Sequence, residues 1–221
     1  MIVYNNGDSF GVVSNGKTYS EFIADHFDAR LINQAKSGAS NSRIFRTTVR
    51  DLLSLDRTSE DVLVLINIST IYRFEYWSNL ADGNDGHFFS VLMSNPDPVT
   101  KLLAKELLSL HNIEAEITKL YYELTLLTTF LTANNFQYLI WNGPNTNEDV
   151  DHQTPFISDF SKIVDNDPHI IPFGSFNFCQ YCLDQGYTPI DYDKYGLYGH
   201  HGEEAHKSFA NYLLENYLNE I

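Results

Sequence analysis

The chain is short of cysteine and of positive charge, and it has no hydrophobic run of membrane-spanning length. Its 221 residues hold two cysteines, Cys179 and Cys182, so the sequence does not support a disulfide framework. The 14 basic residues stand against 29 acidic ones, and the formal charge of −15 argues against binding to nucleic acid or to an anionic membrane. No apolar stretch reaches the ~18 residues that a membrane span needs. The N-terminus lacks the basic and apolar regions of a signal peptide, so we expect a soluble, cytoplasmic protein.

Two further functional classes find little support. The sequence contains neither G-x-G-x-x-G nor G-x-x-x-x-G-K-[S/T], so nucleotide binding through a glycine-rich loop is not expected. Cys179 and Cys182, with His200 and His206, offer the ligand types of a zinc site, but the gap between the pairs is long and no second Cys-x-x-Cys exists. We expect the two cysteines to be small buried residues, and we expect no metal and no cofactor.

The composition and the order of elements predict a layered α/β protein. Hydrophobic residues make up 43% of the chain and aromatic residues 14%, and the length suits one domain over residues 1–221. Strands are predicted, from their apolar runs, at 1–5, 29–33, 61–68, 136–142 and 169–173. Helices are predicted from Thr18, where Glu21 completes a capping box, and over 44–55, 100–133 and 203–218. This alternation predicts a parallel sheet with helices on both faces, interrupted by irregular insertions at 78–99 and 143–168.

Residues suited to acyl transfer follow the predicted strands. Ligands of open parallel sheets bind beyond the carboxyl ends of the strands. A serine becomes nucleophilic when a base, usually histidine, takes its proton, and fixed donors must then stabilise the oxyanion. The chain offers these parts at strand ends and before the last helix, in the segments 7–10, 36–41, 69–70, 142–143 and 199–202.

Three segments resemble the motifs of the GDSL/SGNH hydrolase superfamily. They are GDSF at 7–10, SGASN at 37–41 and GHHGEEAH at 199–206. The resemblance covers the whole chain in order and spacing, and it implies a three-layer α/β/α sandwich with a flavodoxin-like parallel sheet. It also implies that Ser9 is the nucleophile, that the backbone N–H groups of Ser9 and Gly38 serve the oxyanion hole, and that His200 is the base. His201 is the second candidate for the base.

Two positions depart from the pattern of the superfamily. The asparagine of its third motif falls at Thr70, so Ser69 or Thr70 would donate to the oxyanion by side chain. That segment resembles phage-associated relatives, which carry a Ser/Thr pair followed by Arg-x-Glu, here at 73–75. The aspartate expected three residues before the histidine is replaced by Leu197. Asp193 is the nearest substitute and Asp191 the next, and a Ser-His pair without a carboxylate stays open.

Two functions follow from these observations. The resemblance implies a serine ester hydrolase acting on short acyl esters, including O-acetyl groups of glycans, through an acyl-enzyme. The insertion at 78–99, with His87, Phe88, Phe89 and Met93, is the candidate pocket wall. The alternative is a binding or structural module that kept the fold but lost the chemistry, with a glycan or a virion protein as its partner and a virion-associated location. The sequence does not define an oligomeric state.

Overall fold

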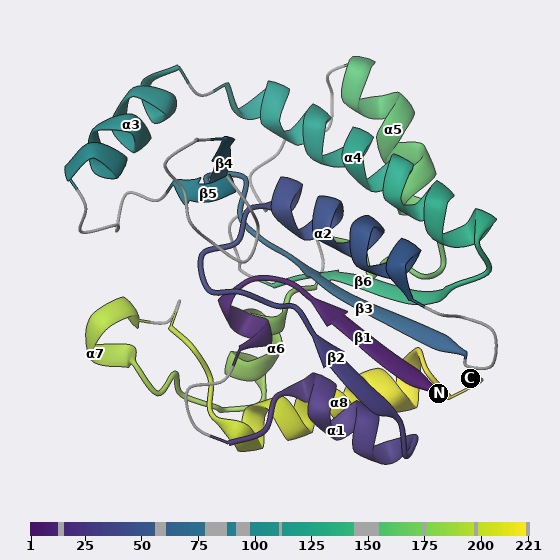
Figure 1. Cartoon of the computed structure of the whole chain (residues 1–221). Coiled ribbons are helices and arrows are strands. Elements are labelled where there is room, and N and C mark those ends of the chain that lie inside the picture. The colour runs from purple at the N-terminus through teal and green to yellow at the C-terminus, as the bar shows by residue number, and fades with distance from the viewer. Residues whose placement is uncertain are drawn as a thin grey trace.

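Four parallel strands form the central sheet, in the order β2-β1-β3-β6 (Figure 1). They are β1 (Ile2–Asn6), β2 (Arg30–Asn33), β3 (Val62–Ile68) and β6 (Gln137–Asn142). The computed structural model describes residues 1–12, 16–55, 61–77, 88–91, 98–110, 112–143, 155–173, 176–196 and 199–219. The predicted three-layer α/β/α architecture is confirmed.

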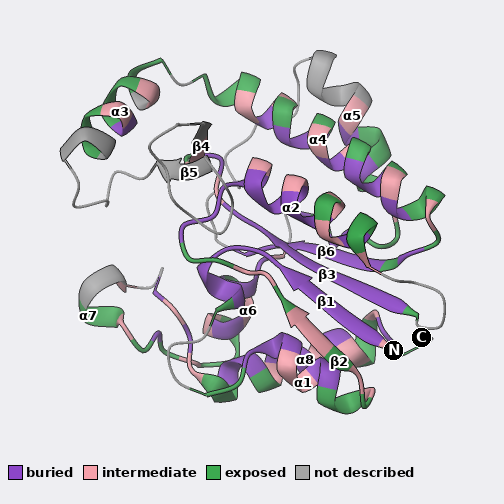
Figure 2. Cartoon of the chain, in the orientation of Figure 1, coloured by how far each residue is buried: buried purple, intermediate pink, exposed green. Residues whose placement is uncertain are grey.

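Helices cover both faces of the sheet (Figure 1). One layer holds α2 (Asn41–Ser54), α4 (Ile113–Ala133) and α5 (Pro155–Asp165), and the other holds α1 (Tyr19–His26), α6 (Phe178–Asp184) and α8 (Glu203–Asn216). Side chains alternate along each strand, so Tyr4 and Val64 pack into the first layer while Val3 and Leu65 pack into the second. β1 and β3, and β6 after its first residue, are therefore buried on both faces (Figure 2), as their continuous apolar runs predicted, whereas the edge strand β2 is partly exposed.

Several elements differ from the sequence-based prediction. The helix expected over 100–133 is two helices, α3 (Pro98–Ser109) and α4, because Asn112 caps the second one by accepting a hydrogen bond from the Ala115 N–H (3.0 Å). The segment 169–173 contributes an isolated bridge between Ile140 and Ile170 instead of a strand. Both insertions contain regular structure. The first carries β5 (Phe88–Val91), which pairs antiparallel with β4 (Phe74–Trp77), and the second carries α5.

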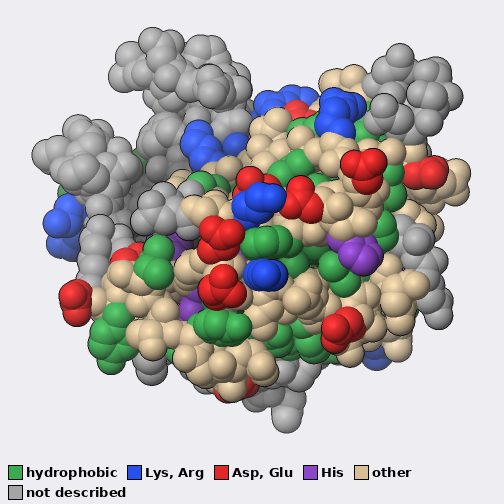
Figure 3. Space-filling view, turned by 90° about the horizontal axis from the view of Figure 1, so that it is seen from below, with side chains coloured by type: hydrophobic (Ala, Val, Ile, Leu, Met, Phe, Trp, Pro, Cys, Tyr) green, Lys and Arg blue, Asp and Glu red, His purple; other side chains and the backbone are tan. Residues whose placement is uncertain are grey.

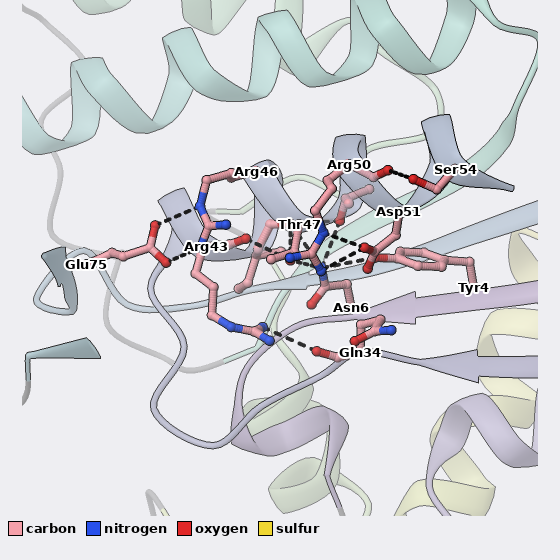
Figure 4. A network of polar contacts seen from close by, with 12 residues as sticks. Tyr4, Asn6, Gln34, Arg43, Arg46, Thr47, Arg50, Asp51, Ser54 and Glu75 are labelled. Carbon is pink, nitrogen blue, oxygen red and sulfur yellow. Dashed lines mark hydrogen bonds and ion pairs between the residues drawn. The ribbon is translucent and has the colours of Figure 1, made fainter. Parts of the chain in front are cut away.

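The carboxyl end of β1 is tied to α2 by a buried asparagine (Figure 4). The Asn6 amide donates to the hydroxyls of Thr47 (2.8 Å) and Thr48 (2.9 Å) and to the carbonyl of Ile44 (3.0 Å). From the same stretch of the helix, Arg46 forms a two-pronged ion pair with Glu75 at the start of β4. These contacts fix the helix against the strand ends, which is where the sequence places its reactive groups.

Charges are mixed on the face formed by α1 and α8. Acidic and basic side chains are interspersed over the described part of this face (Figure 3). The formal charge of −15 is therefore not gathered into one patch there.

The predicted capping box of α1 is formed, and it provides a test of the fold. The Thr18 hydroxyl accepts from the Glu21 N–H, and the Glu21 carboxylate accepts from the Thr18 N–H (2.7 Å). Because Thr18→Ala leaves a helix-terminal N–H unpaired, we expect it to lower the free energy of unfolding by about 1 kcal/mol in urea titrations. Thr129→Ala, at an exposed position within α4, is the matched control and should cost less. If the two variants lost equal amounts of unfolding free energy, the Thr18 cap would not be a specific source of stability.

Candidate active site

The turn after β1 holds Ser9 in a short 3₁₀ helix, η1 (Ser9–Gly11). Asp8 caps this helix by accepting from the Phe10 N–H (3.0 Å). Gly7 is required at the start of the turn, because a Cβ there would lie 1.7 Å from the Asn67 side-chain oxygen. Ser9 is 6% exposed, and its hydroxyl has no hydrogen-bond partner among the described residues. The turn thus presents a hydroxyl that is held in place by its neighbours and not by its own contacts.

The Asp8 side chain anchors this turn to β3 and to the start of β4. It is fully buried, and each of its oxygens accepts two hydrogen bonds. Oδ1 accepts from the Phe10 N–H and the Asn67 amide (2.8 Å), and Oδ2 accepts from the Ser69 hydroxyl (3.0 Å) and from Arg73 (2.6 Å). A buried carboxylate is tolerated when a cation and hydrogen bonds satisfy it, and both are present here.

His200 lies beside the serine turn and is paired with an aspartate. Its ring is 5.4 Å from the ring of Phe10, centroid to centroid. The His200 Nδ1 lies 2.6 Å from the Asp191 Oδ2, and the His200 N–H donates to the Asp191 Oδ1 (2.6 Å). A backbone hydrogen bond from Ile190 to the His200 carbonyl (2.7 Å) closes the intervening loop at its base. The structure therefore joins the histidine favoured by the sequence to a carboxylate.

That carboxylate is Asp191, not Asp193, which the sequence analysis ranked first. Asp193 is exposed in the first turn of α7 (Tyr192–Tyr195), whereas Asp191 precedes the helix and faces back to His200. Burial by itself would raise the pKa of Asp191, but the hydrogen bonds from the ring and the backbone of His200 outweigh it and lower that pKa. The contact with His200 therefore favours the ionised form of Asp191, which can accept a hydrogen bond from the His200 ring and so orient it.

The two neighbouring histidines are placed differently from His200. His201 is 1% exposed, and within the described part of the chain neither ring nitrogen has a hydrogen-bond partner. Burial lowers its pKa to about 4. His206 accepts from the Tyr19 N–H (3.3 Å), and burial lowers its pKa to about 3. Of the three, His200 alone has a carboxylate hydrogen-bonded to its ring in the described residues.

Gly38 offers a backbone donor at the start of α2. It occupies the third position of a turn closed by a hydrogen bond from the Ala39 N–H to the Lys36 carbonyl (3.0 Å), and its φ of +77° favours glycine. Within the described residues the Gly38 N–H has no hydrogen-bond partner. The side chain of Asn41, one turn on, clamps the backbone of Ser69 (2.7 and 2.9 Å) and so links this turn to the end of β3.

Ser69 and Thr70, the two proposed side-chain donors, differ in what their hydroxyls already do. The Ser69 hydroxyl donates to Asp8 and accepts from Arg73 (2.8 Å), so its proton is committed. The Thr70 hydroxyl accepts from the Tyr72 N–H (3.3 Å), which leaves its own proton free of any partner in the described residues. Thr70 is therefore the better placed of the two to donate.

Other residues singled out in the sequence have structural places or lie outside the described ranges. Leu197, His87 and Met93 lie outside them, while Phe88 and Phe89 belong to β5. Arg73 forms an ion pair with Asp8, and Glu75 forms one with Arg46.

The cysteines are buried on α6, as predicted, and burial raises the pKa of Cys179 and Cys182. The described residues contain no group of three histidine, cysteine or acidic side chains that could hold a metal.

A buried polar layer around the Ser9 turn was not predicted from the sequence. Asn67 joins Asp8 to the Tyr19 hydroxyl (2.7 Å), and Asn6 joins β1 to α2. A signal was present, because the apolar runs of β1, β3 and β6 each carry an asparagine near the carboxyl end, at 5–6, 67 and 142. An asparagine in a buried strand needs hydrogen-bond partners. The strand ends supply them to Asn6 and Asn67, whereas the side-chain nitrogen and oxygen of Asn142 have none among the described residues.

The fold is that of GDSL-type lipolytic proteins and esterases. A member of the lipolytic protein G-D-S-L family from Veillonella parvula is 11% identical, with a TM-score of 0.53 over 98% of each chain. The psychrotrophic esterase EstA from Pseudoalteromonas sp. is 16% identical, with a TM-score of 0.52 over 99% of this chain and 97% of its own. The acetyl xylan esterase AlAXEase is 15% identical, with a TM-score of 0.53 over 98% of this chain and 100% of its own. At these identities the likeness establishes the fold.

The chain itself belongs to a defined sequence family. Residues 8–165 match the family of unknown function DUF6071, and that match covers most of the chain. No curated protein matches the sequence. In the described ranges, no helix combines the length and hydrophobicity that a bilayer span requires.

The buried histidines predict how stability depends on pH. The pKa values of His201 and His206 are lowered to about 4 and about 3 in the folded state, from 6.5 for an unperturbed histidine. Their contribution to stability is complete above that value and is lost as the pH falls, because only the unfolded chain takes up the protons. We expect the free energy of unfolding to drop by about 2 kcal/mol between about pH 7 and pH 5.5 in urea titrations.

His206→Asn should make this pH dependence shallower, because the asparagine oxygen can accept from the Tyr19 N–H without titrating. His26→Asn changes an exposed histidine and is the control. If both variants keep the wild-type slope, the buried His206 is not its source.

Proposed function

We propose that the protein is a serine ester hydrolase of the SGNH type, with Ser9 as nucleophile and His200, oriented by Asp191, as base. The observation that carries the proposal is the Asp191–His200 pair beside the Ser9 turn. A hydroxyl, an imidazole and a carboxylate at one sheet edge are the parts that acyl transfer needs. The aspartate reaches the histidine although it lies nine residues before it, not three.

The reaction follows from the roles of these groups. Ser9 Oγ attacks the acyl carbonyl carbon, and its proton passes to His200 Nε2, because Nδ1 faces Asp191. The backbone N–H groups of Ser9 and Gly38, together with the Thr70 hydroxyl, bind the oxygen that gains negative charge. His200 then gives the proton to the leaving alcohol as the ester C–O bond breaks. Water, deprotonated by His200, finally releases the acid from Ser9.

Short acyl esters are the proposed substrates, with O-acetyl groups on glycans as the natural class. Support comes from the motifs around Ser9, Gly38 and His200 and from a fold that an acetyl xylan esterase shares. The Ser-Thr pair followed by Arg73 and Glu75 supports a place in a phage-associated branch of the superfamily, and with it a virion-associated site of action. The chemistry proposed requires no cofactor.

Removing the nucleophile tests the proposal directly. We expect the wild-type protein to hydrolyse p-nitrophenyl acetate and to be labelled at Ser9 by a fluorophosphonate. Ser9→Ala should lower kcat by about 10⁴-fold or more and abolish labelling, because the variant lacks the hydroxyl that the proposed acyl-enzyme needs. An unchanged midpoint of thermal unfolding is the control for folding. Absence of both hydrolysis and labelling in the wild type, with glycan binding retained, would favour a binding module that has lost the chemistry.

The choice of aspartate is tested by two matched variants. Asp191→Asn removes the carboxylate that orients the His200 ring, so kcat should fall by about 10³–10⁴-fold. Asp193→Asn changes an exposed carboxylate two residues away and should leave kcat near the wild-type value. Measuring kcat for p-nitrophenyl acetate with both variants decides the matter. A larger loss in Asp193→Asn would mean that the loop rearranges in the active protein.

A further inference from the structure

Arg73 brings a guanidinium to the turn that carries Ser9. Its Nη1 lies 2.6 Å from the Asp8 Oδ2 and 2.8 Å from the Ser69 hydroxyl. Asp8 is the residue before Ser9, and its other oxygen fixes the Phe10 N–H within the same turn. The Arg73 side chain is 20% exposed and the Asp8 side chain 0%. The partly exposed Arg73 guanidinium thus contacts the fully buried carboxylate of Asp8, the residue next to Ser9.

Most of the donor capacity of Arg73 is unused within the described part of the chain. An arginine has five N–H donors in a planar fork, and the contacts with Asp8 and Ser69 are made through Nη1. Among the described residues, Nε and Nη2 have no hydrogen-bond partner. An arginine whose task was solely to neutralise Asp8 would match its fork to both carboxylate oxygens, as Arg46 does with Glu75.

Arg73 also lies close to the residues that join the Gly38 turn to the end of β3. Its Nη1 donates to the Ser69 hydroxyl, and the Asn41 side chain, three residues after Gly38, is hydrogen-bonded to the Ser69 backbone. The Ser69 hydroxyl, one of the side-chain donors expected from the sequence, is already bonded to Asp8. A charged donor therefore lies beside the Asp8–Ser69 contact that joins the Ser9 turn to the end of β3.

We propose that Arg73 is a charged side-chain donor of the oxyanion hole, beside the Thr70 hydroxyl, and this inference rests on the proposed ester hydrolase function. As Ser9 Oγ bonds to the carbonyl carbon, the C=O π bond breaks and its electron pair moves to oxygen. A free N–H of Arg73 donates to that oxygen, beside the backbone N–H groups of Ser9 and Gly38. A charge-assisted hydrogen bond to an oxyanion is stronger than one to a neutral carbonyl, so the contact favours the transition state over the bound substrate.

The test compares kcat and KM of three variants with p-nitrophenyl acetate. Arg73→Gln should lower kcat by about 10²–10³-fold with little change in KM, as expected when one oxyanion donor is lost. Arg73→Lys keeps the charge beside Asp8 but loses the fork, so it too should be slow while retaining the wild-type unfolding midpoint. Arg46→Gln breaks the comparable ion pair with Glu75 away from Ser9 and should leave kcat unchanged.

A double variant separates catalysis from charge neutralisation. If Arg73 solely balances the buried Asp8, then Asp8→Asn combined with Arg73→Gln removes both charges and should restore kcat. If Arg73 binds the oxyanion, the double variant should stay as slow as Arg73→Gln, and the rate of Ser9 labelling by a fluorophosphonate should fall in parallel. Restored kcat in the double variant, or wild-type kcat in Arg73→Gln, would overturn the inference while leaving the hydrolase function intact. A wild-type protein without hydrolysis or labelling would remove both.

Discussion

The buried carboxylate of Asp8 is the constraint on which the candidate site depends. It is fully buried, and it is satisfied by partners from three segments, namely its own turn, β3 and the start of β4. Leaving such a charge without any one of them would carry the penalty of an unpaired ion in the core. The turn that carries Ser9 is therefore tied to the sheet, although the Ser9 hydroxyl makes no hydrogen bond with the described residues. The neighbours of Ser9 are thus fixed, while the hydroxyl of this proposed nucleophile makes no contact of that kind with the described residues.

The histidine side of the site is built by a loop that returns on itself. Hydrogen bonds join Ile190 and Asp191 to the backbone of His200, so the ends of the intervening loop are held together. The superfamily pattern brings its aspartate close through a short spacing, whereas this chain does so through a closed loop that includes α7. The same physical result, a carboxylate against an imidazole nitrogen, is compatible with quite different spacings because backbone hydrogen bonds bring the loop ends together.

Burial then separates the roles of three histidines that lie within seven residues of one another. His201 and His206 are enclosed by aromatic side chains, with the Phe178 ring 5.8 and 4.9 Å from their rings. Desolvation disfavours their charged forms, and their pKa values fall. His200 sits at the edge of this aromatic cluster and has a carboxylate partner. A histidine that acts as a base needs a carboxylate partner and a position at the edge of the packed cluster. The enclosed positions of His201 and His206 do not provide them.

The sequence by itself determined the four strands of the central sheet, the layered fold and the segments that follow those strands. Val62–Ile68 and Gln137–Asn142 follow from continuous apolar runs, and the start of α1 follows from the Thr18 capping box, because these signals depend on neighbours along the chain. The tertiary structure alone decided which carboxylate meets His200 and where the charge of Arg73 goes. The Asp191–His200 and Asp8–Arg73 pairs form because loops close and side chains become buried. Neither the spacing of residues nor their types predicts the path of such a loop. The break between α3 and α4 was only partly recorded in the sequence. Asn112 is a residue type that caps helices, but the apolar residues keep their helical spacing on both sides of it, so one continuous helix was predicted.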